Sequence, residues 1–284
     1  MRNHLQGIDH VVIAVHDTGH AGATYRRFGF TLTPKGRHTT GSENHCVMFE
    51  HDYFELLGVP VPHPVNQSYQ QFLLQGEGLA AMALATDDAR GFHDELAADG
   101  IGVAEPVDFS RPVQLASGTF DASFRITQLA PQATPGGRVF ACQHFTRELV
   151  WRPEYRQHAN GVQGLARIIA VTESVGVERM AARYAAVFGV APQPGVVGGQ
   201  PRFDVATGDT PLTFTTDGGL AQLLPGVAGP LRSPPYFAAL CFRTASLDAA
   251  RDVLRANGVP CVAWPQGIAV SAEHAHGVAL VFSE

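Results

Sequence analysis

The sequence predicts an α+β protein built from four βαβββ units. Two observations support this fold class: a repeated order of apolar strand, polar turn and amphipathic helix, and a glycine after each helix. The strands that open the four units occupy residues 10–15, 80–85, 166–171 and 237–242. A strand, a helix and then hairpins give a mixed sheet with its helix on one face, so the other face can curve around a ligand.

The glycine after each expected helix is Gly29, Gly100, Gly189 or Gly258. Glycine readily ends a helix in the left-handed conformation, because it has no Cβ to collide with neighbouring backbone. These positions are therefore the firmest boundaries in the sequence. Four helix ends imply four units.

Short apolar runs separated by turn residues predict the remaining strands. In the first unit we expect strands over residues 31–34, 44–50 and 53–58. The matching stretch of the second unit, residues 107–137, is longer and contains several proline and glycine residues. We interpret it either as an elaborated hairpin that overhangs the site or as a plain surface loop.

The length of 284 residues predicts two domains, because one domain typically has about 100–200 residues. Each domain is expected to pair two units into a curved mixed sheet with the helices on its outer face. The break falls in the polar stretch 152–161. The expected domains are residues 1–155, with units 7–58 and 78–151, and residues 156–284, with units 162–225 and 235–284.

Composition excludes several classes of protein. The net charge is −6 and the lysines and arginines are scattered, so we expect no nucleic-acid partner. Residues 1–7 lack the apolar run of a signal peptide, and no stretch is long enough for a membrane span, which favours a cytoplasmic protein without a membrane partner. The four cysteines form no Cys-x-x-Cys pair, so neither a disulfide framework nor a thiolate zinc site is expected. Cys142 stands out because it lies two residues from His144, although a packing role is the simpler interpretation.

Four segments of the N-terminal half resemble the vicinal oxygen chelate superfamily, and within it the glyoxalase-like domain proteins. The segments are IDHVVIAVHD at residues 8–17, GRHTTGSEN at 36–44, YFELL at 53–57 and CQHFTRELVW at 142–151. The resemblance covers about the first 155 residues. The C-terminal half is similar only as paired βαβββ units.

The resemblance implies one divalent metal ion in the cleft between two units, with a ligand from the first and the last strand of each unit. The matching positions are His10, Glu55 and His144, while the fourth falls on Ala80 or Ala81, which cannot bind metal. Three protein ligands leave positions open for water and substrate. Two histidines and one carboxylate suit iron(II), and zinc, manganese and nickel also accept this set.

The local sequence agrees with these ligand positions. Glu55 lies between Phe54 and Leu56 in a run that reads as a buried strand, and a buried carboxylate requires a cation or a proton. His144 likewise follows an apolar run. A structural histidine is the competing interpretation of His10. The first strands of the third and fourth units have Ala166 and Phe237 at the position of His10, so we expect the C-terminal pair to be metal-free and to act as scaffold, lid or dimer surface.

Other polar residues are candidates for substrate binding. His38 and Asn44 lie around one expected hairpin, where a binding role and a solvated turn are equal alternatives, whereas a solvated turn is expected for His45. Arg125 has apolar neighbours and binds either a substrate carboxylate or an acidic side chain of the protein. His274 and His276 have ligand-like spacing, but their position in a hairpin favours an exposed turn.

Three functions follow from the resemblance. The first is a metal-dependent isomerase or lyase of glyoxalase-like type, in which the ion polarises a carbonyl or stabilises an enediolate while a carboxylate such as Glu55, or water, moves the proton. The second is a non-haem iron(II) dioxygenase of the extradiol type. The third is a binding protein that sequesters a small molecule, as antibiotic-resistance members of the superfamily do. The partner in each case is a small molecule, and a homodimer is possible; the substrate does not follow from the sequence.

Overall fold

The computed structural model describes residues 1–284 except 116–117, 231 and 265–266. The N-terminal half contains β1 (Leu5–Ala14), α1 (Thr18–Arg27), β2 (Gly36–Arg37), β3 (Glu43–Met48), β4 (Tyr53–Gly58), α2 (Gln67–Leu73), β5 (Gly78–Thr86), α3 (Ala89–Ala98), β6 (Val107–Leu115), β7 (Gly118–Gln128), β8 (Arg138–His144) and α4 (Arg147–Val150). The C-terminal half contains β9 (Val162–Val171), α5 (Val177–Phe188), β10 (Gln193–Val197), β11 (Gln200–Val205), β12 (Leu212–Thr215), α6 (Asp217–Leu223), β13 (Tyr236–Thr244), α7 (Leu247–Ala256), β14 (Val262–Trp264), β15 (Gly267–Val270) and β16 (Ala279–Ser283). The four βαβββ units are confirmed.

The helix ends agree with the sequence. The glycines that follow α1, α3, α5 and α7 all have positive φ, at 89°, 71°, 65° and 62°. The beginnings of three of these helices are also encoded locally: Asp17, Asp88 and Ser246 each accept a hydrogen bond from a backbone amide in the first turn of α1, α3 and α7. These caps fix the residues at which α1, α3 and α7 begin.

The strand expected over residues 31–34 is wrong. This part of the described chain has no strand, and β2 begins later, at Gly36. The segment is held to β3 by Thr33, whose amide donates to the Cys46 carbonyl at 2.9 Å and whose hydroxyl accepts from the Cys46 amide at 2.8 Å. The Thr33 hydroxyl thus satisfies the Cys46 amide, which a longer ladder would have paired with a backbone carbonyl.

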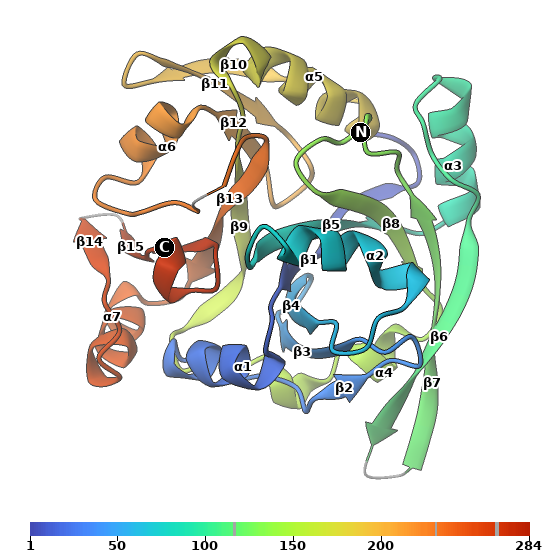
Figure 1. Cartoon of the computed structure of the whole chain (residues 1–284), viewed down its shortest axis with the longest axis horizontal. Coiled ribbons are helices and arrows are strands. Elements are labelled where there is room, and N and C mark those ends of the chain that lie inside the picture. The colour runs from blue at the N-terminus through green and yellow to red at the C-terminus, as the bar shows by residue number, and fades with distance from the viewer. Residues whose placement is uncertain (116–117, 231, 265–266) are drawn as a thin grey trace.

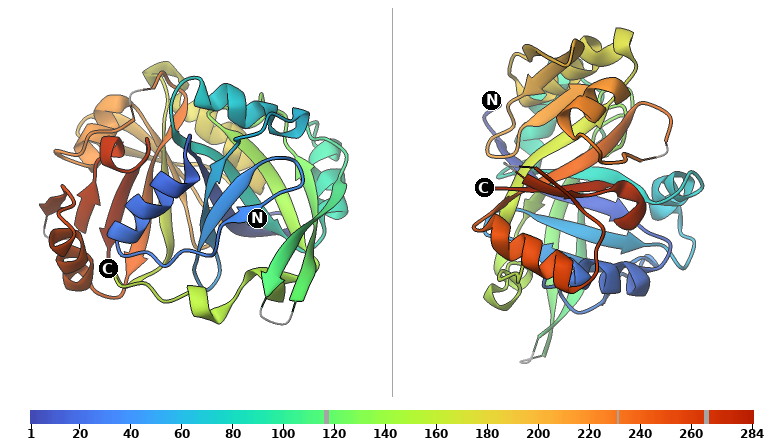
Figure 2. Two further views of the ribbon diagram at one scale, coloured as in Figure 1. Left: turned by 60° about the horizontal axis from the view of Figure 1, so that its bottom comes forward. Right: turned by 90° about the vertical axis from the view of Figure 1, so that its left-hand side faces the viewer.

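The four units join into one continuous curled sheet. Its central order is β10-β11-β12-β9-β13-β5-β1-β4-β3-β2, and β8, β7 and β6 branch from β5 while β16, β15 and β14 branch from β13. The halves meet where β13 pairs with β5, at Phe237 opposite Leu79. The helices α1, α3, α5 and α7 cover the outer faces of their own units (Figures 1 and 2).

The inner faces form two separate apolar clusters. In the N-terminal half, Val12 and Ala14 of β1 lie on the inner face, which lines the cleft, and belong to one cluster with Tyr69 of α2. Val11 and Ile13 face the main core on the other side of the sheet. In the C-terminal half, Leu220 of α6 packs on the corresponding face. Among the described helices none combines the length and the apolar character that a membrane crossing requires.

Asp52 connects the two halves. It lies in the turn between β3 and β4, is 7% exposed, and accepts the Leu165 amide of β9 with its two carboxylate oxygens at 3.1 and 3.3 Å. Burial raises the pKa of this carboxyl to about 7, although the hydrogen bond from Leu165 acts in the opposite direction. The folded chain therefore holds a proton that the unfolded chain releases above about pH 4.

This raised pKa predicts a loss of stability with rising pH. The stabilisation from protonated Asp52 is complete below about pH 4 and is lost as the pH rises through about 7. The unchanged protein should therefore lose on the order of 2 kcal/mol of its free energy of unfolding between pH 5 and pH 8, and Asp52→Asn should not show this loss. Urea unfolding at both pH values measures this difference. Asp94→Asn, at an exposed carboxylate, is the control, and identical pH profiles for all three proteins would contradict the prediction.

Candidate metal centre

A bulge in β1 brings two polar side chains to the cleft. Ile8 pairs with Leu84 and His10 with Ala83, so Asp9 is an extra residue between consecutive pairs of the ladder with β5. Alternation would otherwise send Asp9 and His10 to opposite faces. Both instead lie within the structure at 1% and 5% exposure and contact each other.

Asp9 is the centre of a buried polar network. One oxygen, Oδ2, lies 2.6 Å from His10 Nδ1 and 3.1 Å from His144 Nε2. Burial alone would raise the pKa of Asp9, but the hydrogen bonds from His10 and His144 outweigh it and hold the pKa well below its usual range. Asp9 is therefore a carboxylate at neutral pH, placed between two imidazoles.

Cys142 completes a group of possible metal ligands. Its Sγ lies 3.6 Å from His144 Nε2, and ligand atoms of Asp9, Cys142 and His144 all lie within 4.8 Å of one another. Nδ1 of His144 is buried without a partner in the described structure. Carboxylate oxygen, thiolate sulfur and imidazole nitrogen are all zinc ligands, so this donor set fits a divalent metal. Burial raises the pKa of the Cys142 thiol, and a bound metal would be needed to deprotonate it.

Aromatic rings enclose this network. The ring of His10 stacks on Tyr53 with centroids 4.4 Å apart, and His144 meets Trp151 edge-on at 5.1 Å. Arg147 lies above Trp151 at 3.5 Å and reaches to 3.9 Å from Asp9. The rings fix the two imidazoles and exclude water, which strengthens every charge interaction in the network.

A second polar group lies further along the cleft. Glu55 of β4 is 9% exposed, and one of its oxygens accepts the side-chain amide of Asn44 at 2.5 Å. Asn44 also lines a cavity of about 110 Å³ between β3, β6 and α4, which Arg111 lines from the other side. His38 lies in the same region: its Nδ1 is 2.7 Å from the Ser42 hydroxyl, and its Nε2 is buried without a partner among the described residues.

Two of the three expected ligands lie in one buried network, and the set of His10, Glu55 and His144 stays a prediction. His10 and His144 both contact Asp9, but Glu55 is not part of the group that could hold a metal. The reason is register: Glu55 pairs with Val12, two residues beyond His10 on the neighbouring strand. Across the ladder His10 pairs with Ala83 of β5, which, like Ala80 and Ala81 at the expected fourth position, lacks a ligand atom.

The structure also decides the expectations for Arg125, for residues 107–137 and for His45. Arg125 binds Asp108 across the β6–β7 hairpin, at 2.5 and 2.9 Å, and so forms the ion pair that was one of its two alternatives. The hairpin expected within residues 107–137 is confirmed for β6 and β7, which pair with each other, whereas residues 129–137 lie outside it. The solvated turn expected for His45 is wrong, since this residue is 5% exposed and its Nδ1 lies 2.8 Å from the Thr33 carbonyl.

Paired βαβββ units with a polar cleft are the architecture of the vicinal oxygen chelate superfamily. The chain belongs to the glyoxalase-like domain family, because the model described as "Glyoxalase-like domain" matches residues 8–188. A search of curated proteins finds no match.

Solved structures share the fold at low sequence identity. A hypothetical protein from Staphylococcus aureus is 12% identical, with a TM-score of 0.64 over 97% of this chain and 98% of that one. A xylose isomerase-like TIM barrel/4-hydroxyphenylpyruvate dioxygenase fusion protein is 13% identical, with a TM-score of 0.65 over 99% of this chain, which spans 49% of the fusion protein. A mutant of 4-hydroxymandelate synthase from Streptomyces coelicolor is 14% identical, with a TM-score of 0.54 over 99% of this chain and 93% of that one.

Proposed function

We propose that this protein is a metal-dependent enzyme of isomerase or lyase type that acts on a small molecule in the N-terminal cleft. The observation that supports this proposal best is the buried group of Asp9, Cys142 and His144, with His10 hydrogen-bonded to its carboxylate. A buried carboxylate between two imidazoles and a thiol is costly to assemble without a function.

The residues of the cleft would have distinct roles. A divalent ion bound by Asp9, Cys142 and His144 would polarise an oxygen of the substrate. His10 would orient Asp9, as the outer partners of metal ligands do. Glu55 lies outside the metal group and would move the proton, with its carboxylate oriented by Asn44. Arg111 lines the neighbouring cavity and would contact the part of the substrate that occupies it, and His38, whose Nε2 is buried without a partner among the described residues, would contact the substrate nearby.

Cobalt substitution tests the metal site directly. Protein purified without chelator should contain one divalent ion per chain by elemental analysis. After replacement of that ion by cobalt(II), the expected result is an intense near-ultraviolet charge-transfer absorption from the Cys142 thiolate. Cys142→Ser should abolish that absorption, while Cys261→Ser, at an exposed cysteine, should leave it unchanged. Protein that stays free of metal after supplementation with zinc, manganese, iron and nickel would refute the proposal and leave a small-molecule binding protein as the function.

A non-haem iron dioxygenase is the second candidate. It is favoured by the similarity in fold to a fusion protein and a synthase whose names refer to 4-hydroxyphenylpyruvate dioxygenase and 4-hydroxymandelate synthase. Oxygen uptake by the iron(II)-loaded protein, measured with catechols and 2-oxoacids, separates the two functions. Consumption of oxygen with stoichiometric iron would replace the isomerase or lyase proposal by this one.

A further inference from the structure

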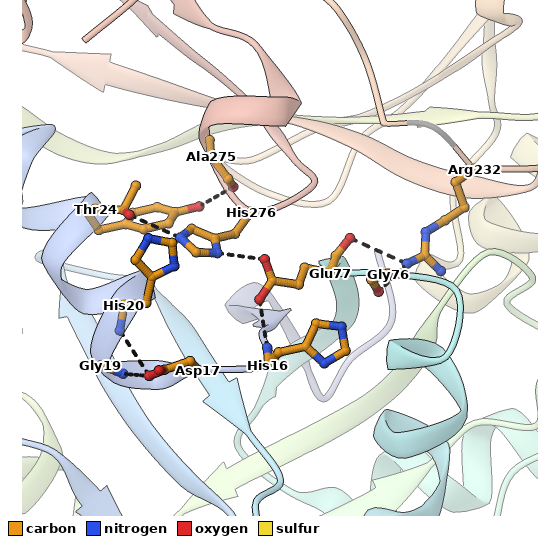
Figure 3. Close-up of polar contacts among 11 residues, drawn as sticks. His16, Asp17, Gly19, His20, Thr24, Gly76, Glu77, Arg232, Ala275 and His276 are labelled. Carbon is orange, nitrogen blue, oxygen red and sulfur yellow. Dashed lines mark hydrogen bonds and ion pairs between the residues drawn. The ribbon is translucent and has the colours of Figure 1, made fainter. Parts of the chain in front are cut away.

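A large cavity lies between the two halves of the chain, away from the candidate metal centre. Its volume is about 730 Å³, and its walls are α1, the segment before β5, the segment before β13 and the loop between β15 and β16. His16 and His20 reach it from beyond the C-terminal end of β1, whereas Asp9 lies in the N-terminal part of that strand. Figure 3 shows the polar contacts at this site.

Several basic and imidazole side chains lie in the walls. The lining includes two arginines and four histidines, which are Arg27, Arg232, His16, His20, His274 and His276. The two carboxylates in the lining already have partners: Glu77 lies 2.7 Å from His276 Nδ1, and Glu273 lies 3.5 Å from His274 Nε2. The lining therefore has as many arginines as carboxylates, and its four imidazoles add further hydrogen-bonding groups.

Arg232 lies in the cavity wall with only neutral partners. Its guanidinium is stacked 3.7 Å from the ring centroid of Phe72, and Nη2 donates to the carbonyls of Gly76 and Glu77 at 2.7 and 3.4 Å. No carboxylate within the described ranges lies at ion-pair distance, and partial burial lowers the pKa of this arginine. A partly buried guanidinium that has only neutral partners is stabilised by a bound anion.

The opposite wall is held rigidly. His276 is 9% exposed, and its ring spans from Glu77 to the Thr24 hydroxyl of α1, which lies 3.2 Å from Nε2. Glu77 also accepts the His16 amide at 2.7 Å. His276 has a φ of 58°, a left-handed conformation that is uncommon outside glycine, so the surrounding contacts determine its position. The exposed turn expected for His276 is therefore wrong.

We propose that this cavity binds a small organic anion, a phosphate or a carboxylate, and that Arg232 holds the anionic group. A volume of about 730 Å³ suits a metabolite rather than a single inorganic ion. His20 lies beside His276, with ring centroids 5.2 Å apart, and its imidazole would contact the same ligand. The site is independent of the proposed metal centre, because it shares no residue with it.

Isothermal titration calorimetry with three probes tests this site: glycerol 3-phosphate, succinate and neutral glycerol. The unchanged protein should bind at least one of the two anions and not glycerol. Arg232→Gln should weaken that binding about tenfold or more, since a charge-assisted hydrogen bond is lost. Arg232→Lys should retain part of the affinity. Arg90→Gln, at an exposed arginine of α3, is the matched control and should bind as the unchanged protein does.

Several results would overturn the assignment. These are the absence of binding with both anions, equal affinity for glycerol, or unchanged affinity in Arg232→Gln. If Arg232→Gln melts at a lower temperature than the unchanged protein, His20→Gln replaces it, because His20 is exposed on α1 and its substitution should not affect folding. A preference for glycerol 3-phosphate or for succinate identifies the anionic group. Metal content should be the same in all of these variants, so failure here is distinguishable from failure of the metal proposal.

Discussion

Asp9→Asn should lower the affinity of the N-terminal cleft for zinc by about 100-fold or more. Asp9 supplies the only carboxylate of the metal group, and both histidines are hydrogen-bonded to it. An asparagine has nearly the same shape but no charge, so it would neither balance the metal ion nor hold both imidazoles. Competition with a chromophoric zinc chelator measures the affinity.

The control for this change is Asp121→Asn, which removes an exposed carboxylate from the β6–β7 hairpin and should leave zinc affinity unchanged. Circular dichroism of the metal-free proteins separates loss of metal binding from loss of folding. Equal zinc affinity in Asp9→Asn and in the unchanged protein would show that the ion is held elsewhere. The expected set of His10, Glu55 and His144 would then be tested by Glu55→Gln.

Gly277→Ala should lower the free energy of unfolding by about 3 kcal/mol or more. Gly277 has a φ of 77°, and a Cβ built on it would lie 2.0 Å from the carbonyl oxygen of Glu77. The loop between β15 and β16 would have to move away from the segment before β5, breaking the contact between His276 and Glu77. Urea denaturation monitored by fluorescence measures the loss.

Gly100→Ala separates the cost of the left-handed backbone from the cost of the clash with the Glu77 carbonyl. Gly100 has a similar φ of 71°, but a Cβ there meets no atom within 4 Å. Its substitution should cost about 1 kcal/mol, from the left-handed backbone alone. Equal losses in the two variants would mean that the contact with Glu77 adds nothing to stability.

The sequence predicts the repeated units well, because each rests on short-range signals. A helix-ending glycine such as Gly189 acts within a single turn, so no knowledge of distant contacts is needed. The strand expected over residues 31–34 fails for the opposite reason. Whether an extended segment joins a sheet depends on a partner strand, and here the hydroxyl of Thr33 replaces part of the ladder.

The candidate site is predicted only in part. His10 and His144 lie in one network as expected, but that network is centred on Asp9, which the sequence does not single out. A bulge places Asp9 in the cleft, and a bulge leaves no clear pattern in a single sequence. His276 shows the same limit, since its partners Thr24 and Glu77 lie about 200 or more positions away in the chain.

The pairing of β13 with β5 has a consequence for how the chain unfolds. One main core contains residues of both halves, and within it Phe30 of the first unit lies 5.3 Å from Phe242 of the fourth, between ring centroids. Neither half can then lose its structure without exposing apolar surface of the other. Despite its four repeats, the protein is expected to melt in a single cooperative transition, and a chain cut within residues 152–161 would yield fragments that associate rather than two independent domains.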